Sequence, residues 1–173
     1  EEPVEDTAEE TKEGETEEED SSVETSGDQV QTDRLAFSGD SHLLWPVDGD
    51  VILNYSMDKS IYFSTLNQYK YHPAIVISAP VGSEVISAAK GKVSQITVNE
   101  ETGTTLTMEL GDGYEAVYGQ LKEVSVQEGD TIESGTLLGY VSEPTKYYTL
   151  EGSNLYFQVL KDGEAVNPMN YIE

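Results

Sequence analysis

Few side chains in this 173-residue sequence could hold a metal ion or act as a nucleophile. The chain has two histidines, His42 and His72, and no cysteine, so it has neither thiolate chemistry nor disulfides. A catalytic zinc needs about three protein ligands and an open position for water. No carboxylate stands at a spacing from His72 that would complete such a set; those considered are Asp58, Glu84, Glu109 and Glu115. The residues by themselves therefore predict no metal centre, and nothing specific supports catalysis by paired carboxylates.

The elements that would position His72 are short strands. Six segments rich in branched and aromatic residues are separated by Gly- and Asp-containing turns; they are residues 51–55, 61–63, 74–78, 91–98, 104–110 and 115–118. Within one of them Leu106, Met108 and Leu110 alternate with polar residues and are expected on one face. Residues 64–69 are expected to form one short turn of helix. Many short strands at regular spacing predict an all-β antiparallel sandwich or barrel.

Two stretches of the sequence resemble each other. A Gly-led turn and short strand at 82–88 recurs at 129–135, and Gly91-Lys92-Val93 recurs as Gly139-Tyr140-Val141. The echo indicates either two half-units packed about a pseudo-dyad or a chance recurrence of turn chemistry. Lipoyl and biotinyl carrier domains share such half-units, but Lys90 in Ala-Ala-Lys-Gly lacks the flanking residues that a modified lysine requires.

The negative charge is concentrated near the start of the chain. Residues 1–33 hold fifteen acids and one lysine, whereas residues 34–173 hold nineteen acids and eight bases. Residues 1–40 are therefore expected to form a disordered acidic linker ahead of a domain at 41–173. The acidity and the lack of a basic patch argue against nucleic acid as a partner. An acidic spacer would suit a domain held away from a membrane, so we expect a membrane anchor upstream of this sequence.

From Trp45 onward the sequence resembles the M23 peptidase family, also called the LytM or lysostaphin-type domain. No single match is specific, but their order and spacing together indicate the fold. The matching positions include Trp45-Pro46-Val47, His72, Ala79-Pro80 with Gly82, Gly91 with Val93, Gly113-Tyr114, Gly129-Asp130 with Gly135, Leu155 with Phe157, and Gly163 with Val166-Asn167-Pro168. The resemblance refines the expected fold to a LytM-like antiparallel β-sandwich of the barrel-sandwich-hybrid type.

The family resemblance implies a groove that binds zinc and cleaves peptide bridges in peptidoglycan. The family's three ligands are the His and Asp of His-x-x-x-Asp and the second His of His-x-His. Here the matching positions hold His72, Val76 and Tyr156, and the two further catalytic histidines are replaced by Gln120 and Asn154. A phenol with an ordinary pKa of ~10 is a poor metal ligand. The resemblance therefore implies a degenerate member with no zinc, no cofactor and no peptidase activity.

Each replaced position also has a purely structural interpretation. Val76 is expected in the core. Gln120 and Asn154 could bind the backbone of a peptide or glycan, or could only satisfy neighbouring polar groups. His72, next to Pro73, is expected to be a surface or hydrogen-bonded residue, and its replacement by alanine is expected to leave folding nearly unchanged.

A tyrosine-rich loop stands where the family has a small loop that rims the groove. It contains Lys146, Tyr147 and Tyr148, and the pair Tyr69 and Tyr71 lies beside the same groove by the same resemblance. These bulky residues could fill the former cleft or could form a patch for a partner, since tyrosine is enriched at interfaces. The candidate contacts are Tyr69, Tyr71, His72, Gln120, Lys146, Tyr147, Tyr148, Asn154 and Tyr156.

The sequence therefore favours a non-catalytic binding or scaffold module outside the cytoplasm, on the outer face of the cytoplasmic membrane. Degenerate members of the family act as adaptors that activate amidases in division, or form part of a sporulation channel between two membranes. The expected partner is an envelope protein or peptidoglycan. The alternative is an active peptidoglycan endopeptidase with an atypical site, which stoichiometric zinc in the purified protein would reveal.

Overall fold

The computed structural model of the chain describes residues 34–173. The acidic segment 1–33, for which disorder was predicted, lies outside the described residues. Apart from a single 3₁₀ turn, Pro168–Asn170, the described part contains only strands, turns and loops. Among these residues there is no helix with the length and apolar character needed to cross a bilayer.

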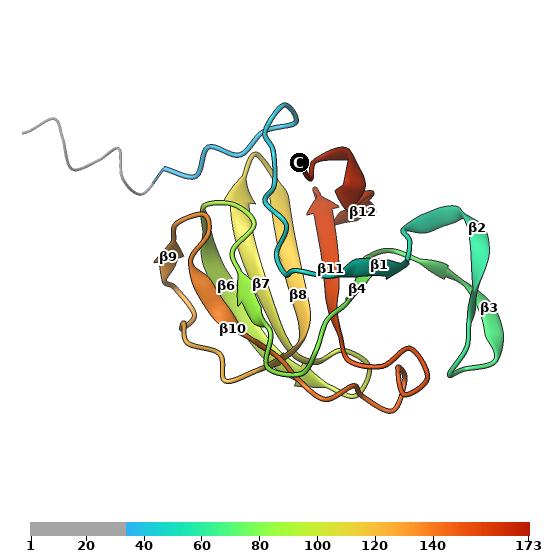
Figure 1. Ribbon diagram of the computed structural model, residues 1–173. Coiled ribbons are helices and arrows are strands. Elements are labelled where there is room, and N and C mark those ends of the chain that lie inside the picture. The colour runs from blue at the N-terminus through green and yellow to red at the C-terminus, as the bar shows by residue number, and fades with distance from the viewer. Residues whose placement is uncertain (1–33) are drawn as a thin grey trace, which may run out of the picture. The chain divides into compact units, whose positions relative to one another are not determined.

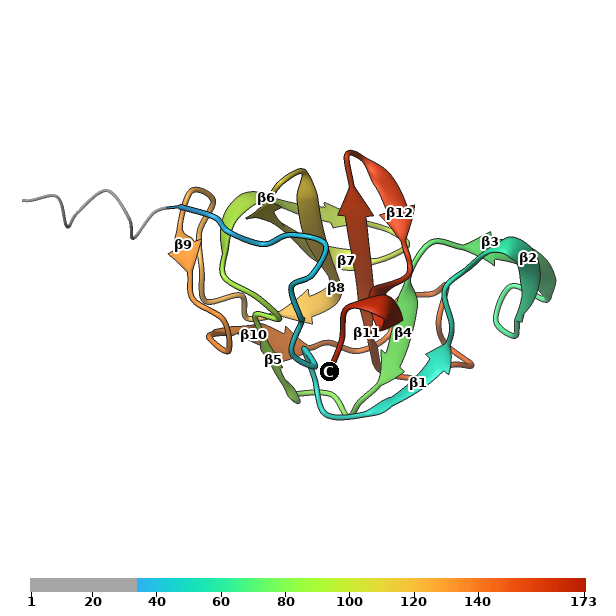
Figure 2. The ribbon, with the colours of Figure 1, turned by 90° about the horizontal axis from the view of Figure 1, so that it is seen from above.

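The strands form one large antiparallel sheet and one separate hairpin (Figure 1). The main path of the sheet runs β1 (Asp50–Leu53), β4 (Ile75–Ser78), β11 (Asn154–Lys161), β8 (Tyr114–Lys122), β7 (Gly103–Gly111), β6 (Gly91–Asn99) and β9 (Thr131–Ile132). Strand β10 (Leu137–Val141) pairs with β8 and with β5 (Glu84–Ile86), and β12 (Glu164–Val166) pairs with β11. The hairpin consists of β2 (Ser56–Phe63) and β3 (Gln68–His72) and projects from the body of the domain (Figures 1 and 2). The fold is the expected antiparallel β-sandwich of the barrel-sandwich-hybrid type.

Two Asp-Gly turns show why the sequence folds back where it does. Tight loops at Asp112-Gly113 and Asp162-Gly163 join β7 to β8 and β11 to β12, and all four residues have positive φ. Positive φ at both loop residues matches the twist of the flanking strands, which is why Asp-Gly favours hairpins. The short helix expected at 64–69 is wrong. Residues 64–67 form the turn of the β2–β3 hairpin, Asn67 adopts a φ of 51°, and Gln68 already begins β3.

The repeated stretches are related in the structure as well. The Gly82 N–H donates to the carbonyl of Val141, and the Gly129 N–H donates to the carbonyl of Val93, both at 2.8 Å. In return Val141 donates to Ser83 and Val93 donates to Asp130, both at 2.9 Å. Each half-unit thus pairs with a strand of the other, which is the arrangement expected for a pseudo-dyad. The echo therefore has a structural basis.

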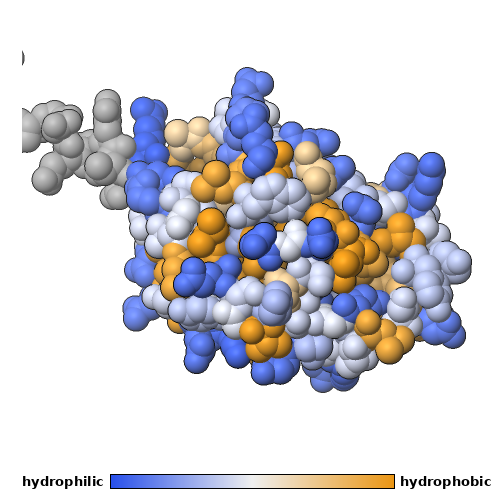
Figure 3. Space-filling model, in the orientation of Figure 1, coloured by the Kyte–Doolittle hydropathy of each residue, from blue (hydrophilic) through white to orange (hydrophobic). Residues whose placement is uncertain are grey.

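The buried side chains form two separate clusters. The larger one lies inside the sandwich and includes Leu106, Met108 and Leu110, which share the buried face as expected. Phe37 also packs in it, edge-on against Tyr114, so contact with the core begins before the expected domain start at residue 41. The smaller cluster lies beneath the β2–β3 hairpin and contains Phe63, Ala74, Val76, Tyr148 and Tyr156. On the face shown in Figure 3, apolar areas are separated by charged and polar side chains.

Candidate functional site

The five positions singled out by the family resemblance lie together, where the hairpin meets the sheet. His72 ends β3, and Val76 on β4 is the direct strand partner of Tyr156 on β11. Gln120 lies on β8 beside β11, and Asn154 begins β11. All five side chains are buried, with exposed fractions of 9% or less. The sheet register thus brings the predicted residues to one place, but beneath the surface.

His72 is enclosed rather than at the surface. Its Nδ1 lies 3.2 Å from the carbonyl oxygen of Asn54, which can only accept, so Nδ1 carries the hydrogen. Its Nε2 is buried and has no hydrogen-bond partner among the described residues. Burial lowers the pKa of His72, so the ring is held neutral. Because the ring also packs edge-on against Phe63 and Tyr156, the expectation that alanine at this position would leave folding unchanged does not fit its surroundings.

Apolar and aromatic side chains surround the other two ligand positions. Val76 is fully buried, as expected for a core residue, and it packs with Phe63, Tyr148 and Tyr156. Burial raises the pKa of Tyr156 to about 12, which keeps its phenol protonated at neutral pH. A metal ligand must be deprotonated, and burial makes deprotonation of Tyr156 less favourable, so its phenol is a poor ligand here.

The two catalytic positions are closed by a chain of amide hydrogen bonds. Gln120 Nε2 donates to Asn154 Oδ1, and Asn154 Nδ2 donates to the carbonyl of Gly152 at 2.7 Å. Gln120 Oε1 accepts from the Thr145 N–H at 3.0 Å. Neither side chain is exposed. In the structure these amides satisfy neighbouring polar groups, and Gln120 ties the loop between β10 and β11 to β8.

The tyrosine-rich loop fills the space beside these positions. Tyr148 is 1% exposed and packs in the smaller cluster, whereas Tyr147 is partly buried at its edge. The loop is also tied to the hairpin turn, because the Thr65 N–H and hydroxyl both donate to the Glu151 carboxylate, and the Leu150 N–H donates to Thr65 Oγ1 at 2.8 Å. Tyr148 therefore occupies space beside the five positions, and hydrogen bonds tie the loop to the hairpin turn.

An open hollow of about 640 Å³ remains above the buried positions. Lys70, Tyr71, Tyr147 and Tyr156 contribute to its walls, and His72 lies at its base. Two ion pairs link its rims: Lys70 to Glu101 at 3.3 Å and Lys146 to Glu100 at 2.9 Å. Both lysines are thus matched by a carboxylate of the β6–β7 turn. The hollow is lined by both polar and aromatic side chains.

The donors at this site do not fit a zinc ion. The family's site needs three ligands. Here the Nε2 of His72 has a free lone pair, but Val76 has no donor atom, and burial favours the protonated phenol of Tyr156. Within residues 34–173, no three His, Cys, Asp or Glu side chains are grouped so that they could hold a metal. This donor set therefore does not support zinc-dependent hydrolysis.

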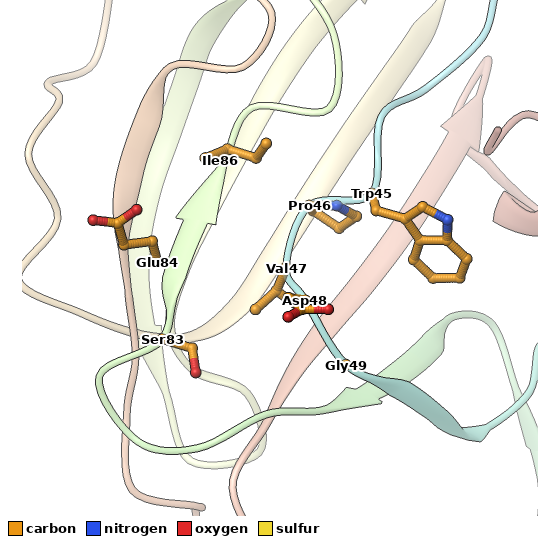
Figure 4. A pocket seen from close by; sticks show the side chains of 8 residues that line it. All are labelled: Trp45, Pro46, Val47, Asp48, Gly49, Ser83, Glu84 and Ile86. Atoms are coloured by element: carbon orange, nitrogen blue, oxygen red, sulfur yellow. The ribbon is translucent and has the colours of Figure 1, made fainter.

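A second hollow, of about 620 Å³, lies beside the segment that leads into β1 (Figure 4). In Figure 4 Trp45 and Glu84 lie on opposite sides of it, and Asp48 is between them. Its lining contains no histidine and no basic residue that could act together with the carboxylates. The candidate functional site is therefore the one formed by His72 and its neighbours, and not this second hollow.

Sequence reasoning missed two features of the site: Phe63 in its apolar cluster, and the hydrogen bonds between Thr65 and Glu151 that tie the loop to the hairpin turn. Phe63 could have been identified from the sequence, because it ends the apolar segment 61–63 and lies nine residues before His72. Nothing in the sequence indicated that Thr65 would meet Glu151, because the two residues are 86 positions apart.

Several known proteins are similar to this chain in sequence. The chain is 32% identical over 97 residues to Stage II sporulation protein Q of Bacillus subtilis (strain 168), a match that covers 56% of this chain and 31% of that protein. It is 26% identical over 129 residues to Murein hydrolase activator EnvC of Escherichia coli (strain K12), covering 74% of this chain and 28% of EnvC. The chain thus spans about a third of the length of the curated relatives it matches.

Solved structures show the same fold. A SpoIIQ–SpoIIIAH pore forming complex matches with a TM-score of 0.66 and 24% identity, over 77% of this chain and 92% of that one. Csd3 of Helicobacter pylori matches with a TM-score of 0.63 and 23% identity, over 77% of this chain and 35% of that one. The family model described as "Peptidase family M23" matches residues 70–168, which include all five site positions. This chain therefore belongs to peptidase family M23.

Proposed function

We propose that this chain is a non-catalytic M23 homologue that acts as a binding or scaffold module at the cell envelope. The observation that carries the proposal is the replacement of a metal site by an apolar cluster. Val76 and Tyr156 pack with Phe63 and Tyr148, while Gln120 and Asn154 bond to each other. A groove of this kind can make contacts, but it lacks the electron-pair donors needed to activate water.

The cellular setting of the proposal is supported by the relatives. Stage II sporulation protein Q, Stage IV sporulation protein FA and Murein hydrolase activator EnvC are named for sporulation or for cell-wall hydrolysis. We place this domain outside the cytoplasm, held by a membrane anchor upstream on the outer face of the cytoplasmic membrane, in sporulation or cell-wall remodelling. Its partner would be an envelope protein or peptidoglycan. The solved SpoIIQ–SpoIIIAH pore forming complex supports a protein partner.

The test combines metal content with hydrolysis. The purified chain is dialysed against zinc, its bound metal is measured by mass spectrometry, and purified sacculi are then incubated with it in the presence and absence of a chelator. We expect substoichiometric zinc and no released muropeptides, with a catalytically active M23 enzyme as the positive control. Muropeptide release that the chelator stops would refute the proposal. Co-sedimentation with sacculi then separates peptidoglycan from protein as the partner.

A further inference from the structure

The hairpin that projects from the domain has two tyrosines in ring contact near its turn (Figures 1 and 2). Tyr62 on β2 and Tyr69 on β3 are direct cross-strand partners, so their side chains leave the hairpin on the same face. Their ring centroids lie 5.2 Å apart at an interplanar angle of 52°. Neither residue belongs to the five positions of the former metal site. The pair is therefore a second, separate arrangement of side chains that could do chemistry.

The surroundings hold this pair in place and leave it open to solvent. The Tyr62 hydroxyl donates to Asn67 Oδ1 in the hairpin turn at 2.7 Å. The turn is itself bonded to the loop before β11, because Thr65 donates to the Glu151 carboxylate. Tyr62 and Tyr69 nevertheless keep exposed fractions of 45% and 71%. An oxidant in solution can therefore reach both phenols without any unfolding.

Two phenols in contact can be joined by one-electron oxidation. Loss of one electron and one proton from each ring gives two phenoxyl radicals, in which the unpaired electron resides partly on the carbons ortho to the oxygen. A carbon–carbon bond forms between one ortho carbon of each ring. The hydrogen on each of these carbons then moves to the phenol oxygen as a proton, which restores both hydroxyls. The two electrons and two protons removed convert one molecule of hydrogen peroxide to two of water, so the reaction balances with a peroxide as oxidant.

Ring contact, rather than closeness in the sequence, distinguishes this pair from other tyrosines. Tyr69 and Tyr71 are only two residues apart, but among the described residues their rings make no contact with each other. Tyr114 and Tyr171 are in contact, with centroids 5.6 Å apart, but Tyr114 is buried away from an oxidant. Holding two reacting groups together raises their effective concentration far above that of a second chain in solution. Coupling within the hairpin is therefore favoured over coupling between chains.

We propose that Tyr62 and Tyr69 are a site of oxidative crosslinking, at which a haem peroxidase and hydrogen peroxide join the two rings by a carbon–carbon bond. The bond ties β2 to β3 beside their turn and fixes the projecting hairpin covalently. This inference goes beyond the proposed function and does not depend on it.

The experiment treats the full chain, at low micromolar concentration, with a haem peroxidase and hydrogen peroxide, and then digests it with trypsin. Cleavage after Lys59 and Lys70 releases the peptide 60–70, whose only tyrosines are Tyr62 and Tyr69. We expect this peptide to lose two hydrogen atoms and to give no fragment ions from backbone cleavage between its two tyrosines. The internally linked peptide should form in at least about tenfold excess over covalent dimers of the chain.

Phenylalanine variants provide matched controls, because each removes one phenol and keeps the ring. Tyr62→Phe and Tyr69→Phe should each abolish the loss of hydrogen from peptide 60–70. Tyr71→Phe alters an exposed tyrosine on the same strand and should leave the yield unchanged. Each variant is first shown to be folded by its thermal transition, and free N-acetyltyrosine in a parallel reaction shows that the oxidant is active.

Several outcomes would overturn the inference. They are an unchanged peptide 60–70 under conditions that couple N-acetyltyrosine, an excess of covalent dimers over the internal link, survival of the link in Tyr62→Phe or Tyr69→Phe, and its loss in Tyr71→Phe. Addition of oxygen to the exposed Met57 or Trp45 without loss of hydrogen from the peptide would also overturn it, because the oxidant would then have reached the chain without coupling the rings. These peptide masses are independent of the zinc and muropeptide measurements, so failure of this inference is distinct from failure of the proposed function.

Discussion

Restoring two side chains should convert the apolar cluster into a zinc site. Val76 and Tyr156 are direct strand partners, and the rings of His72 and Tyr156 lie 6.1 Å apart. Two imidazoles on one tetrahedral zinc, each with a Zn–N distance of about 2.1 Å, place their ring centres roughly 5 Å apart. The double variant Val76→Asp/Tyr156→His is therefore expected to bring His-Asp-His close enough to share one ion.

The expected effect is large and has opposite signs without and with metal. Without zinc, a carboxyl group placed at a fully buried position of an apolar cluster should lower the free energy of unfolding by about 3–5 kcal/mol. With free zinc at about 100 times the dissociation constant, binding should return about 2.7 kcal/mol, or roughly 10 °C in Tm. The assay is thermal unfolding with and without zinc, together with metal content after dialysis.

Matched controls make the result decisive. Each single variant offers one ligand fewer, and the triple variant that adds His72→Ala to the pair removes the remaining native donor, so all three should show little zinc-dependent shift. Hydrolysis of sacculi should stay absent in the double variant because Gln120 and Asn154 still stand at the catalytic positions. The reasoning is refuted if the unaltered chain shows the same zinc-dependent shift, or if the double variant folds in zinc without binding it.

Further substitutions test the filling of the site. Tyr148→Ala should lower the free energy of unfolding by about 3–5 kcal/mol in urea titrations, because it empties a buried ring position, whereas Tyr148→Phe should cost far less; equal effects would contradict the packing argument. Gln120→Ala should lower the free energy of unfolding by about 1–3 kcal/mol, because it leaves Asn154 Oδ1 and the Thr145 N–H unpaired. A double-mutant cycle with Asn154→Ala should show a coupling energy of at least about 0.5 kcal/mol. Strictly additive effects would argue against the hydrogen-bond network. Folding lowers the pKa of His72, so below the ordinary value of ~6.5 the unfolded chain binds more protons than the folded chain. The stability that depends on neutral His72 is therefore fully present above that pH and is lost as the pH falls below it. His72→Phe should therefore gain stability relative to the unaltered chain as the pH is lowered from about 7.5 to 5, and a Tm difference that does not change with pH would contradict the assigned burial.

Much of the fold could be predicted because its signals are local. Alternation of Leu106, Met108 and Leu110 with polar residues marked β7, and the Asp-Gly pairs marked two hairpin turns. Strand β11 was not identified as a strand, although its apolar residues also alternate. The helical turn expected at 64–69 was wrong because the pairing of β2 with β3 makes residues 64–67 a hairpin turn, in which Asn67 adopts a positive φ.

The sequence by itself determined which atoms are available at the site. The residue types at positions 72, 76, 120, 154 and 156 set the number of possible metal donors before any folding is considered. Which donor atoms a side chain carries depends on its residue type and not on the fold. Only the tertiary structure decided what these residues do instead. Burial favours the protonated phenol of Tyr156, and the pairing of β8 with β11 brings Gln120 to Asn154. Hydrogen bonds between Thr65 and Glu151 tie the hairpin turn to the loop before β11. These outcomes depend on solvent exclusion and on contacts between residues far apart in the chain, which local sequence patterns do not encode.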